Sequence, residues 1–216
     1  MKKFFKYLLV LPLLWACGSD NDSLNIVQNE QKVKMNASEE HKIETLSDRD
    51  VSFSSENSFI AAVNKEGIVT ASKVGTTFIK VLSDVKSQKV KITVEPKYWL
   101  YEDPILEFGI TYTALSRKIQ LTQSDNPDIY LYKSSSKNTS LYRYRFSSGT
   151  LRSVDLDVIA SRASEVDKFL EERYKVITES PRAYINAFEQ SVATVFVQTN
   201  KTPKGEVNIV YSSPRH

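Results

Sequence analysis

The chain has 216 residues with a formal net charge of +3, and it contains one cysteine and two histidines. A single cysteine excludes a disulfide framework and a cysteine-based metal site. Nucleic-acid binding is not expected: without Lys2, Lys3 and Lys6, which lie in a predicted signal segment, 26 basic residues balance 26 acidic ones.

The first 16 residues have the organisation of a signal peptide. Three lysines precede an apolar run over residues 7–15, which is too short to span a bilayer, since a transmembrane helix needs about 20 apolar residues. The sequence Leu14-Trp15-Ala16-Cys17 then resembles the lipobox of bacterial lipoproteins. This resemblance implies that Cys17 is acylated and anchors the mature chain to a membrane. An ordinary secretory signal with an incidental cysteine is the alternative.

Residues 17–25 form a predicted acidic, polar tether. Asp20 and Asp22 follow the lipobox closely, and this resembles the export signal of Bacteroidetes-type surface lipoproteins. The resemblance implies a protein that is lipid-anchored in the outer membrane and faces the cell surface. A plain solvated linker has the same composition, so the periplasmic side stays open as an alternative.

Residues 26–96 carry short runs of alternating apolar and polar side chains, which predict antiparallel strands with one buried face. The clearest such runs are residues 31–35, 41–46 and 88–94. Short β-prone segments fill residues 51–81, with Gly67 and Gly75 where the chain must reverse. The predicted core residues are Val33, Met35, Ile43, Phe53, Ile60, Val69, Phe78, Ile79, Val90, Ile92 and Val94.

The spacing within residues 51–81 resembles the group 2 bacterial immunoglobulin-like domain, a small β-sandwich of bacterial surface proteins. The matching residues are Phe53, Ser55, Ile60, Ala61, Val63, Gly67, Val69, Ala71, Gly75, Thr76, Ile79 and Val81. Phe53 departs from the family, which usually has Trp at that position. The resemblance implies an N-terminal all-β immunoglobulin-like sandwich over residues 26–96, and it implies no ligand.

The pattern changes after Pro96, and residues 97–216 are predicted to form an α+β domain, an antiparallel sheet with two helices on one face. Residues 97–104 are interpreted as a linker. The predicted helices are residues 111–121, with Thr111 as N-cap, and residues 161–174, with Lys168–Glu172 and Glu171–Lys175 pairs. The predicted strands are residues 128–133, 140–146, 151–159, 176–178, 192–199 and 207–211.

The order helix, strands, helix, strands leaves open an internal duplication of a helix-plus-sheet unit. Phe108-Gly109-Ile110-Thr111, just before the first predicted helix, resembles the repeat of β-lactamase inhibitor proteins and of small barrel-assembly lipoproteins. That resemblance covers a few residues only, and it implies an envelope assembly factor.

No catalytic motif is present: the sequence has no His-Glu-x-x-His, no Gly-x-Ser-x-Gly and no phosphate-binding glycine loop. No metal site and no cofactor are expected. Glu102, Asp103 and Glu107 form a candidate carboxylate set for a glycosidase, which needs only two such groups several Å apart. A solvated linker is the favoured interpretation of the same residues, and a carboxylate-dependent hydrolase of extracellular polysaccharide remains an alternative function.

Aromatic residues gather in the second half of the chain. Every tyrosine except Tyr7 lies at or beyond Tyr98, and Trp99 is the only tryptophan after Trp15. Because Tyr and Trp anchor interfaces, Tyr98, Trp99 and Tyr101 are predicted to bind a ligand. Packing at the domain junction is the alternative for these three residues.

One predicted strand alternates two residue types. Tyr142, Tyr144 and Phe146 share one face, and Arg143 and Arg145 share the other. The aromatic residues are expected to pack beneath a helix while the arginines face water. A basic, aromatic binding face is the alternative.

Together these features predict a non-catalytic cell-envelope lipoprotein. Its immunoglobulin-like spacer is expected to present a C-terminal binding domain to a glycan or protein at the cell surface. The predicted partners are the membrane, through a lipid anchor at Cys17, and an unknown glycan or protein ligand.

Overall fold

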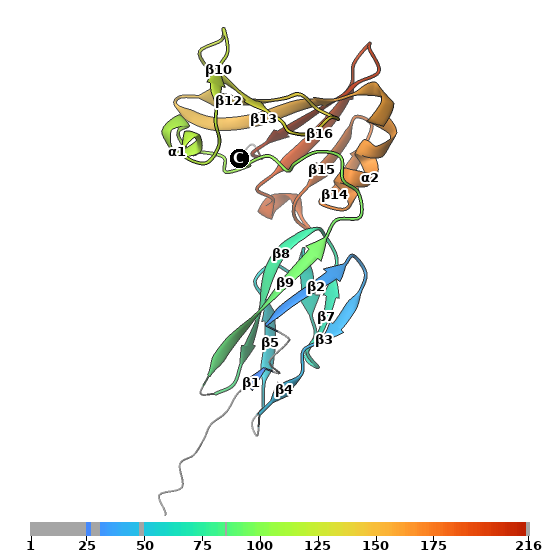
Figure 1. Cartoon of the computed structure of the whole chain (residues 1–216). Coiled ribbons are helices and arrows are strands. Elements are labelled where there is room, and N and C mark those ends of the chain that lie inside the picture. The colour runs from blue at the N-terminus through green and yellow to red at the C-terminus, as the bar shows by residue number, and fades with distance from the viewer. Residues whose placement is uncertain (1–24, 27–30, 48–49, 85, 215–216) are drawn as a thin grey trace, which may run out of the picture.

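The computed structural model describes residues 25–26, 31–47, 50–84 and 86–214. Two groups of strands follow one another along the chain, each with its own hydrophobic core (Figure 1). Cys17, Asp20 and Asp22 lie outside the described residues, so the lipid anchor and the tether remain predictions.

The N-terminal strands form a sandwich of two small sheets. One sheet has the order β2-β9-β8-β5 and the other β3-β7-β6, while β1 pairs with β4 alone. β2 runs parallel to β9, and the other pairs are antiparallel. The strands are β1 (Asn25–Ile26), β2 (Lys32–Asn36), β3 (Glu40–Lys42), β4 (Thr45–Leu46), β5 (Ser52–Ser55), β6 (Ala61–Val63), β7 (Ile68–Ala71), β8 (Gly75–Leu82) and β9 (Ser87–Glu95).

The predicted core of this sandwich is confirmed with one exception. Seven of the named residues are buried between the sheets: Met35, Ile43, Val69, Ile79, Val90, Ile92 and Val94. Val33, Phe53 and Ile60 pack against them at the margin. The prediction for Phe78 is wrong, because the alternation along β8 turns its ring outward, where it is 38% exposed beneath the Lys89 ammonium group.

Gly67 shows why the family pattern couples a glycine to an aromatic residue. Its φ of +79° is one that residues with a Cβ rarely adopt. A Cβ placed there would also lie 2.8 Å from Cζ of Phe53, so the ring closes over the turn only because the glycine has no side chain. Gly75 has the same relation to Ile60, whose Cδ1 would lie 2.9 Å from an added Cβ.

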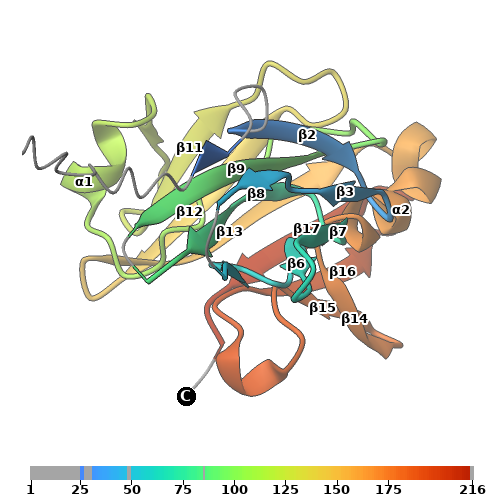
Figure 2. The same cartoon turned by 90° about the horizontal axis from the view of Figure 1, so that it is seen from below.

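The C-terminal strands form one antiparallel sheet of eight strands, in the order β10-β11-β12-β13-β17-β16-β15-β14. Figure 2 shows this order from β11 to β14 across the molecule. The elements are α1 (Tyr112–Ser116), β10 (Thr122–Gln123), β11 (Ile129–Lys133), β12 (Leu141–Ser147), β13 (Thr150–Val158), the 3-10 helix η1 (Ala160–Glu165), α2 (Val166–Glu171), β14 (Lys175–Glu179), β15 (Arg182–Ile185), the 3-10 helix η2 (Gln190–Val192), β16 (Phe196–Lys201) and β17 (Val207–Ser212).

This topology is a repeated unit. A short helix, α1, precedes four strands that pair in sequence from β10 to β13, and α2 precedes four that pair in sequence from β14 to β17. The two units join through their last strands, where Val154 of β13 faces Tyr211 of β17. The duplication that the sequence left open is therefore present as a duplication of topology.

Both predicted helices are much shorter than expected, so this half of the chain is largely sheet rather than a balanced α+β domain. α1 keeps the predicted N-cap, since the Thr111 hydroxyl accepts a hydrogen bond from the Ala114 amide, but it ends at Ser116. The second predicted helix is divided into η1 and α2. The intrahelical pairs expected along it do not form, because Glu171 binds Arg182 and Glu172 binds backbone amides of the preceding segment.

Two further segments differ from expectation. The sequence did not predict β15, which pairs with β14 and β16 near the far edge of the sheet. Residues 97–104, interpreted as a linker, instead contribute Leu100 and Tyr101 to the second core, with exposed fractions of 2% and 4%. The segment therefore belongs to the C-terminal structure, because its apolar side chains are buried there.

Glu172 joins the two halves of the chain. Its carboxylate accepts hydrogen bonds from the backbone amides of Lys97, at 3.1 Å, and Tyr98, at 3.0 Å. Its carbonyl oxygen accepts a third bond, at 2.8 Å, from the Val74 amide of the sandwich. The end of α2 thus contacts both the immunoglobulin-like sandwich and the segment that leaves it.

Candidate functional site

The eight-stranded sheet has one sealed face and one open face. On the sealed face, the chain after Lys97 runs across the strands (Figure 1), and the Tyr101 hydroxyl lies 2.6 Å from the Tyr211 hydroxyl. The Tyr142 hydroxyl donates to the Glu102 carbonyl at 2.7 Å. Burial raises the pKa of Tyr144 to about 12, so this hydroxyl stays protonated at neutral pH.

The open face carries a ladder of charges across β12, β13 and β17. Asp155 is 4% exposed and is bound by Arg143 and by Arg145, whose Nε lies 2.6 Å from an Asp155 oxygen. Asp157 accepts from Arg143 at 2.7 Å and from the Asn208 amide at 2.8 Å. Two arginines and two carboxylates neutralise one another here. The arginines lie opposite the aromatic residues of β12 as expected, but Arg143 is only 27% exposed, because it binds carboxylates instead of facing water.

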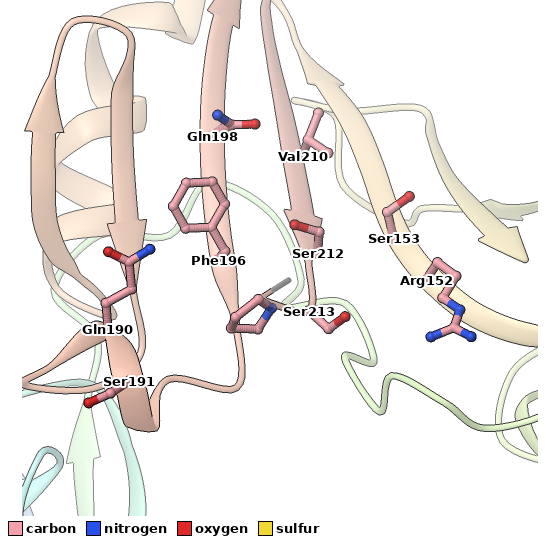
Figure 3. A pocket seen from close by; sticks show the side chains of 10 residues that line it. Arg152, Ser153, Gln190, Ser191, Phe196, Gln198, Val210, Ser212 and Ser213 are labelled. Atoms are coloured by element: carbon pink, nitrogen blue, oxygen red, sulfur yellow. The ribbon is translucent and has the colours of Figure 1, made fainter. Parts of the chain in front are cut away.

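Beside this ladder the open face is hollowed. The hollow has a volume of about 1370 Å³ and reaches from β13 across β17 and β16 to η2. Figure 3 shows Arg152 and Ser153 on one side and Gln190 and Ser191 on the other. The lining consists of Arg152, Ser153, Gln190, Ser191, Phe196, Gln198, Val210, Ser212, Ser213 and Pro214.

A β-bulge aims Arg152 into this hollow. Arg145 pairs with Ser153 and the next residue, Phe146, pairs with Leu151, so Arg152 is an extra residue without a partner on β12. Such a bulge redirects side chains that would otherwise alternate between faces. Arg152 and its neighbour Ser153 consequently both line the hollow, while Leu151 and Val154 are buried in the core.

The opposite wall of the hollow is the connection from β15 to β16, and Asn186 holds it in place. The Asn186 side-chain oxygen accepts from the amides of Thr194 and Val195, both at 2.9 Å. Its amide group donates to the Thr194 hydroxyl at 2.8 Å. Phe188 of the same connection packs edge-on against Phe59 of the sandwich, with ring centroids 5.3 Å apart. The wall is therefore fixed at both ends.

The three aromatic residues predicted to bind a ligand lie in different environments, and none lines the hollow. Trp99 is 71% exposed, whereas Tyr98 is half-buried between the Lys97 and Lys168 ammonium groups, each 5.8 Å from its ring centroid. Tyr101 is buried and bonded to Tyr211, so a ligand-binding role for Tyr101 at the surface is corrected to a core role. Roles for Tyr98 and Trp99 stay predictions.

The candidate hydrolase carboxylates are held by separate partners. Asp103 accepts from Arg173 at 2.9 Å, and Glu107 binds Lys118. Glu102 accepts from the Ser135 hydroxyl. Each carboxylate thus stabilises a local contact. Asp103 borders a small cavity of about 210 Å³ between the two halves of the chain, where Arg173 neutralises it.

No group of three or more His, Cys, Asp or Glu side chains is placed to hold a metal ion among the residues that the structure describes. Within the same part of the chain, no helix is long and apolar enough to cross a membrane.

Comparison with known proteins identifies the N-terminal half. Residues 22–94 match the bacterial Ig-like domain (group 2), so this segment is an immunoglobulin-like domain of that group. The match begins inside the predicted tether. No curated protein matches the chain.

Among solved structures, the chain is similar to the S-layer protein SbsC, domains 5-6, with 14% identity and a TM-score of 0.30. The similarity covers 90% of this chain and 86% of that one. A TM-score this low carries no argument about fold or function.

The hollow was not predicted from the sequence, although one signal of it was present. Leu151-Arg152-Ser153-Val154 places two polar residues between two apolar ones and so interrupts the alternation of the strand. An interruption of this kind indicates a bulge, and bulges concentrate near functional sites. No such signal indicated that Gln190 and Ser191 line the hollow, because their position depends on how the connection from β15 to β16 folds back over the sheet.

Proposed function

We propose that this chain is a non-catalytic cell-envelope lipoprotein, anchored through Cys17 in the outer membrane and facing the cell surface. Its immunoglobulin-like domain serves as a spacer, and its C-terminal sheet binds a glycan or a protein. The observation that carries this proposal is the hollow of about 1370 Å³ on the open face of the sheet. A concave site with converging polar groups is the usual form of a binding site.

The spacer role is supported by the side chains that the immunoglobulin-like domain lacks. Residues 22–94 contain no tyrosine and no tryptophan, and these are the residues that most often anchor interfaces. Of its phenylalanines, Phe53 packs in the core and Phe59 contacts Phe188 of the C-terminal half. The exposed Phe78 ring is partly covered by Lys89.

An envelope assembly factor is the second candidate function. Two features favour it: the repeated helix-plus-sheet unit, and the resemblance of residues 108–111 to the repeat of β-lactamase inhibitor proteins and of small barrel-assembly lipoproteins. In that case the ligand of the open face is a protein. The hydrolase alternative has no comparable support, because the three candidate carboxylates are held by separate partners.

A glycan and protein array probed with residues 18–216 tests the proposal. The variant Gln198→Trp fills the hollow at an exposed strand position, and Lys91→Trp makes the same change at an exposed position of the immunoglobulin-like domain. We expect Gln198→Trp to abolish binding of any ligand found and Lys91→Trp to retain it. The opposite result would place binding on the supposed spacer and refute the proposal.

A further inference from the structure

The hollow on the open face has a chemistry that selects among ligands. Its lining includes four serines and two glutamines, with Phe196 as its only aromatic residue. An amide side chain offers both a hydrogen-bond donor and an acceptor, and a serine hydroxyl group can act as either. Glutamine and serine side chains together therefore match the hydroxyl groups of a sugar. A single aromatic ring at the base of such a site suits the apolar C–H face of a pyranose ring.

A folded protein partner fits this lining less well. Protein interfaces rely on a central cluster of apolar and aromatic anchors surrounded by a polar rim. Here seven of the ten lining residues are polar or charged. The apolar ones are Val210, Pro214 and Phe196, which packs against the buried Ile185, Ala187 and Ala193. The opening also spans the strands from β13 to β16, about 10 Å at the usual strand spacing, which leaves room for more than one sugar ring.

Among the residues that the structure describes, one gives the hollow its charge. Arg152 is its only charged lining residue, and within the described part of the chain Arg152 forms neither a hydrogen bond nor an ion pair. The nearest carboxylates of the same face, Asp155 and Asp157, are already bound by Arg143 and Arg145. The guanidinium group therefore remains available for an anion, and its planar fork matches a carboxylate.

We infer that the hollow binds an acidic glycan, with Arg152 pairing with a sugar carboxylate while Phe196 supports the sugar ring and the glutamines and serines bind its hydroxyl groups. This inference rests on the proposed function, because it names the ligand class of the same hollow. The chain thereby distinguishes a uronate polymer from its neutral counterpart by one charge-assisted contact. The long opening suits a segment of a polymer better than a free monosaccharide.

The test uses residues 18–216 and three uronate polymers, namely polygalacturonate, alginate and hyaluronan, measured by affinity electrophoresis and calorimetry. Fully methyl-esterified polygalacturonate and dextran are the neutral controls, and the ester keeps the sugar while removing the charge. We expect at least one uronate polymer to bind and the neutral polymers to bind at least about tenfold more weakly, a difference of about 1.4 kcal/mol. The affinity should also fall as salt is added.

Variants separate a local contact from general charge attraction. Arg152→Gln should weaken uronate binding at least about tenfold, and Arg152→Lys should have an intermediate effect, because lysine keeps the charge but not the fork. Arg117→Gln is the matched control, since Arg117 is exposed, has no ion pair with a described residue and follows a helix that packs on the sealed face. Circular dichroism verifies that each variant is folded.

Three outcomes would overturn the inference. One is that Arg152→Gln weakens binding no more than Arg117→Gln. Another is that esterified and free polygalacturonate bind equally. A third is that no uronate polymer binds while the array yields a neutral glycan or a protein, which refutes the acidic glycan and leaves the proposed function standing. If neither the polymers nor the array yield a ligand, both proposals fail.

Discussion

Glu172 offers a sharp test of how the two halves of the chain are joined. Its side chain is 14% exposed, and its carboxylate accepts hydrogen bonds from two consecutive backbone amides, those of Lys97 and Tyr98. Glu171, the preceding residue, pairs with Arg182 and is 45% exposed. The two glutamates therefore differ in burial and in partners while they occupy neighbouring positions at the end of α2.

The expected free-energy changes follow from these contacts. A hydrogen bond to a charged group contributes about 1.5–3 kcal/mol. In Glu172→Ala the exposed Lys97 amide regains water, whereas the half-buried Tyr98 amide does not, so we expect a loss of about 2 kcal/mol of unfolding free energy. Glu172→Gln keeps one acceptor oxygen and should lose about 1 kcal/mol. Glu171→Ala should lose less than about 0.5 kcal/mol, because exposed ion pairs contribute little and Arg182 keeps Asp167.

Urea unfolding of residues 18–216 measures these differences. Far-UV circular dichroism follows the transition, because Trp99, the only tryptophan in that segment, is already 71% exposed in the folded protein. Linear extrapolation gives the unfolding free energy of each variant, and an unchanged m-value verifies that the same surface is exposed. Equal losses in Glu172→Ala and Glu171→Ala would refute the assignment of Glu172 as the acceptor of the two backbone amides at the junction.

Three other predictions concern the anchor, a turn and the tyrosines. Cys17→Ala should abolish metabolic labelling with palmitate, and a mutant that is processed and membrane-bound like the parent would disprove the lipobox. Gly67→Ala should cost roughly 2–4 kcal/mol, since it adds a clash with Phe53 to an unfavourable φ, whereas Gly109→Ala, with an equally positive φ but open space, should cost about 1–2 kcal/mol in urea unfolding. The stability that the buried tyrosines contribute should be constant up to about pH 10 and then fall by up to about 1.4 kcal/mol per pH unit per buried tyrosine, because an unfolded tyrosine ionises near 10 while burial raises the pKa of Tyr144 to about 12. Urea unfolding at pH 9 and pH 11 measures the loss.

The sequence predicted the immunoglobulin-like domain well because its signals are local. Gly67 must have a positive φ, and it lies against Phe53, so the family pattern records a contact that the backbone requires. The alternation in β8 and β9 likewise fixes which side chains face the core. Phe78 is the exception, since an aromatic residue suggested burial at a position where the alternation already indicated the opposite face.

The helices of the C-terminal half were overestimated for a physical reason. Residues 161–174 have a helical apolar stripe, and Val166, Phe169 and Leu170 are indeed buried. The charged residues expected to stabilise a long helix instead bind partners distant in sequence, which the period of the pattern cannot reveal. Tertiary contacts therefore decided where the helix ends.

The candidate site likewise could not be predicted from the sequence, because it is formed by tertiary contacts. Alternation predicts one polar face on β12, β13 and β17, but it does not show that the face stays uncovered. Asp155 and Arg143 balance one another within that face, so a row of charges becomes a neutral surface beside Arg152, which has no ion pair with any residue that the structure describes. The distinction between paired and unpaired arginines requires the register of the strands, and the bulge that sets this register appears in the sequence only as one interrupted alternation.

The contact between Phe59 and Phe188 restricts how the immunoglobulin-like domain can be oriented relative to the C-terminal half. Phe188 lies in the connection that forms one wall of the hollow, and Phe59 belongs to the immunoglobulin-like domain. The Lys73 ammonium group also donates, at 2.6 Å, to the carbonyl oxygen of Glu171 at the end of α2. The immunoglobulin-like domain thus contacts the C-terminal half both beside the hollow and at α2, which limits rotation about the single chain segment that joins them. Contacts of this kind fix the direction in which the hollow faces relative to the immunoglobulin-like domain.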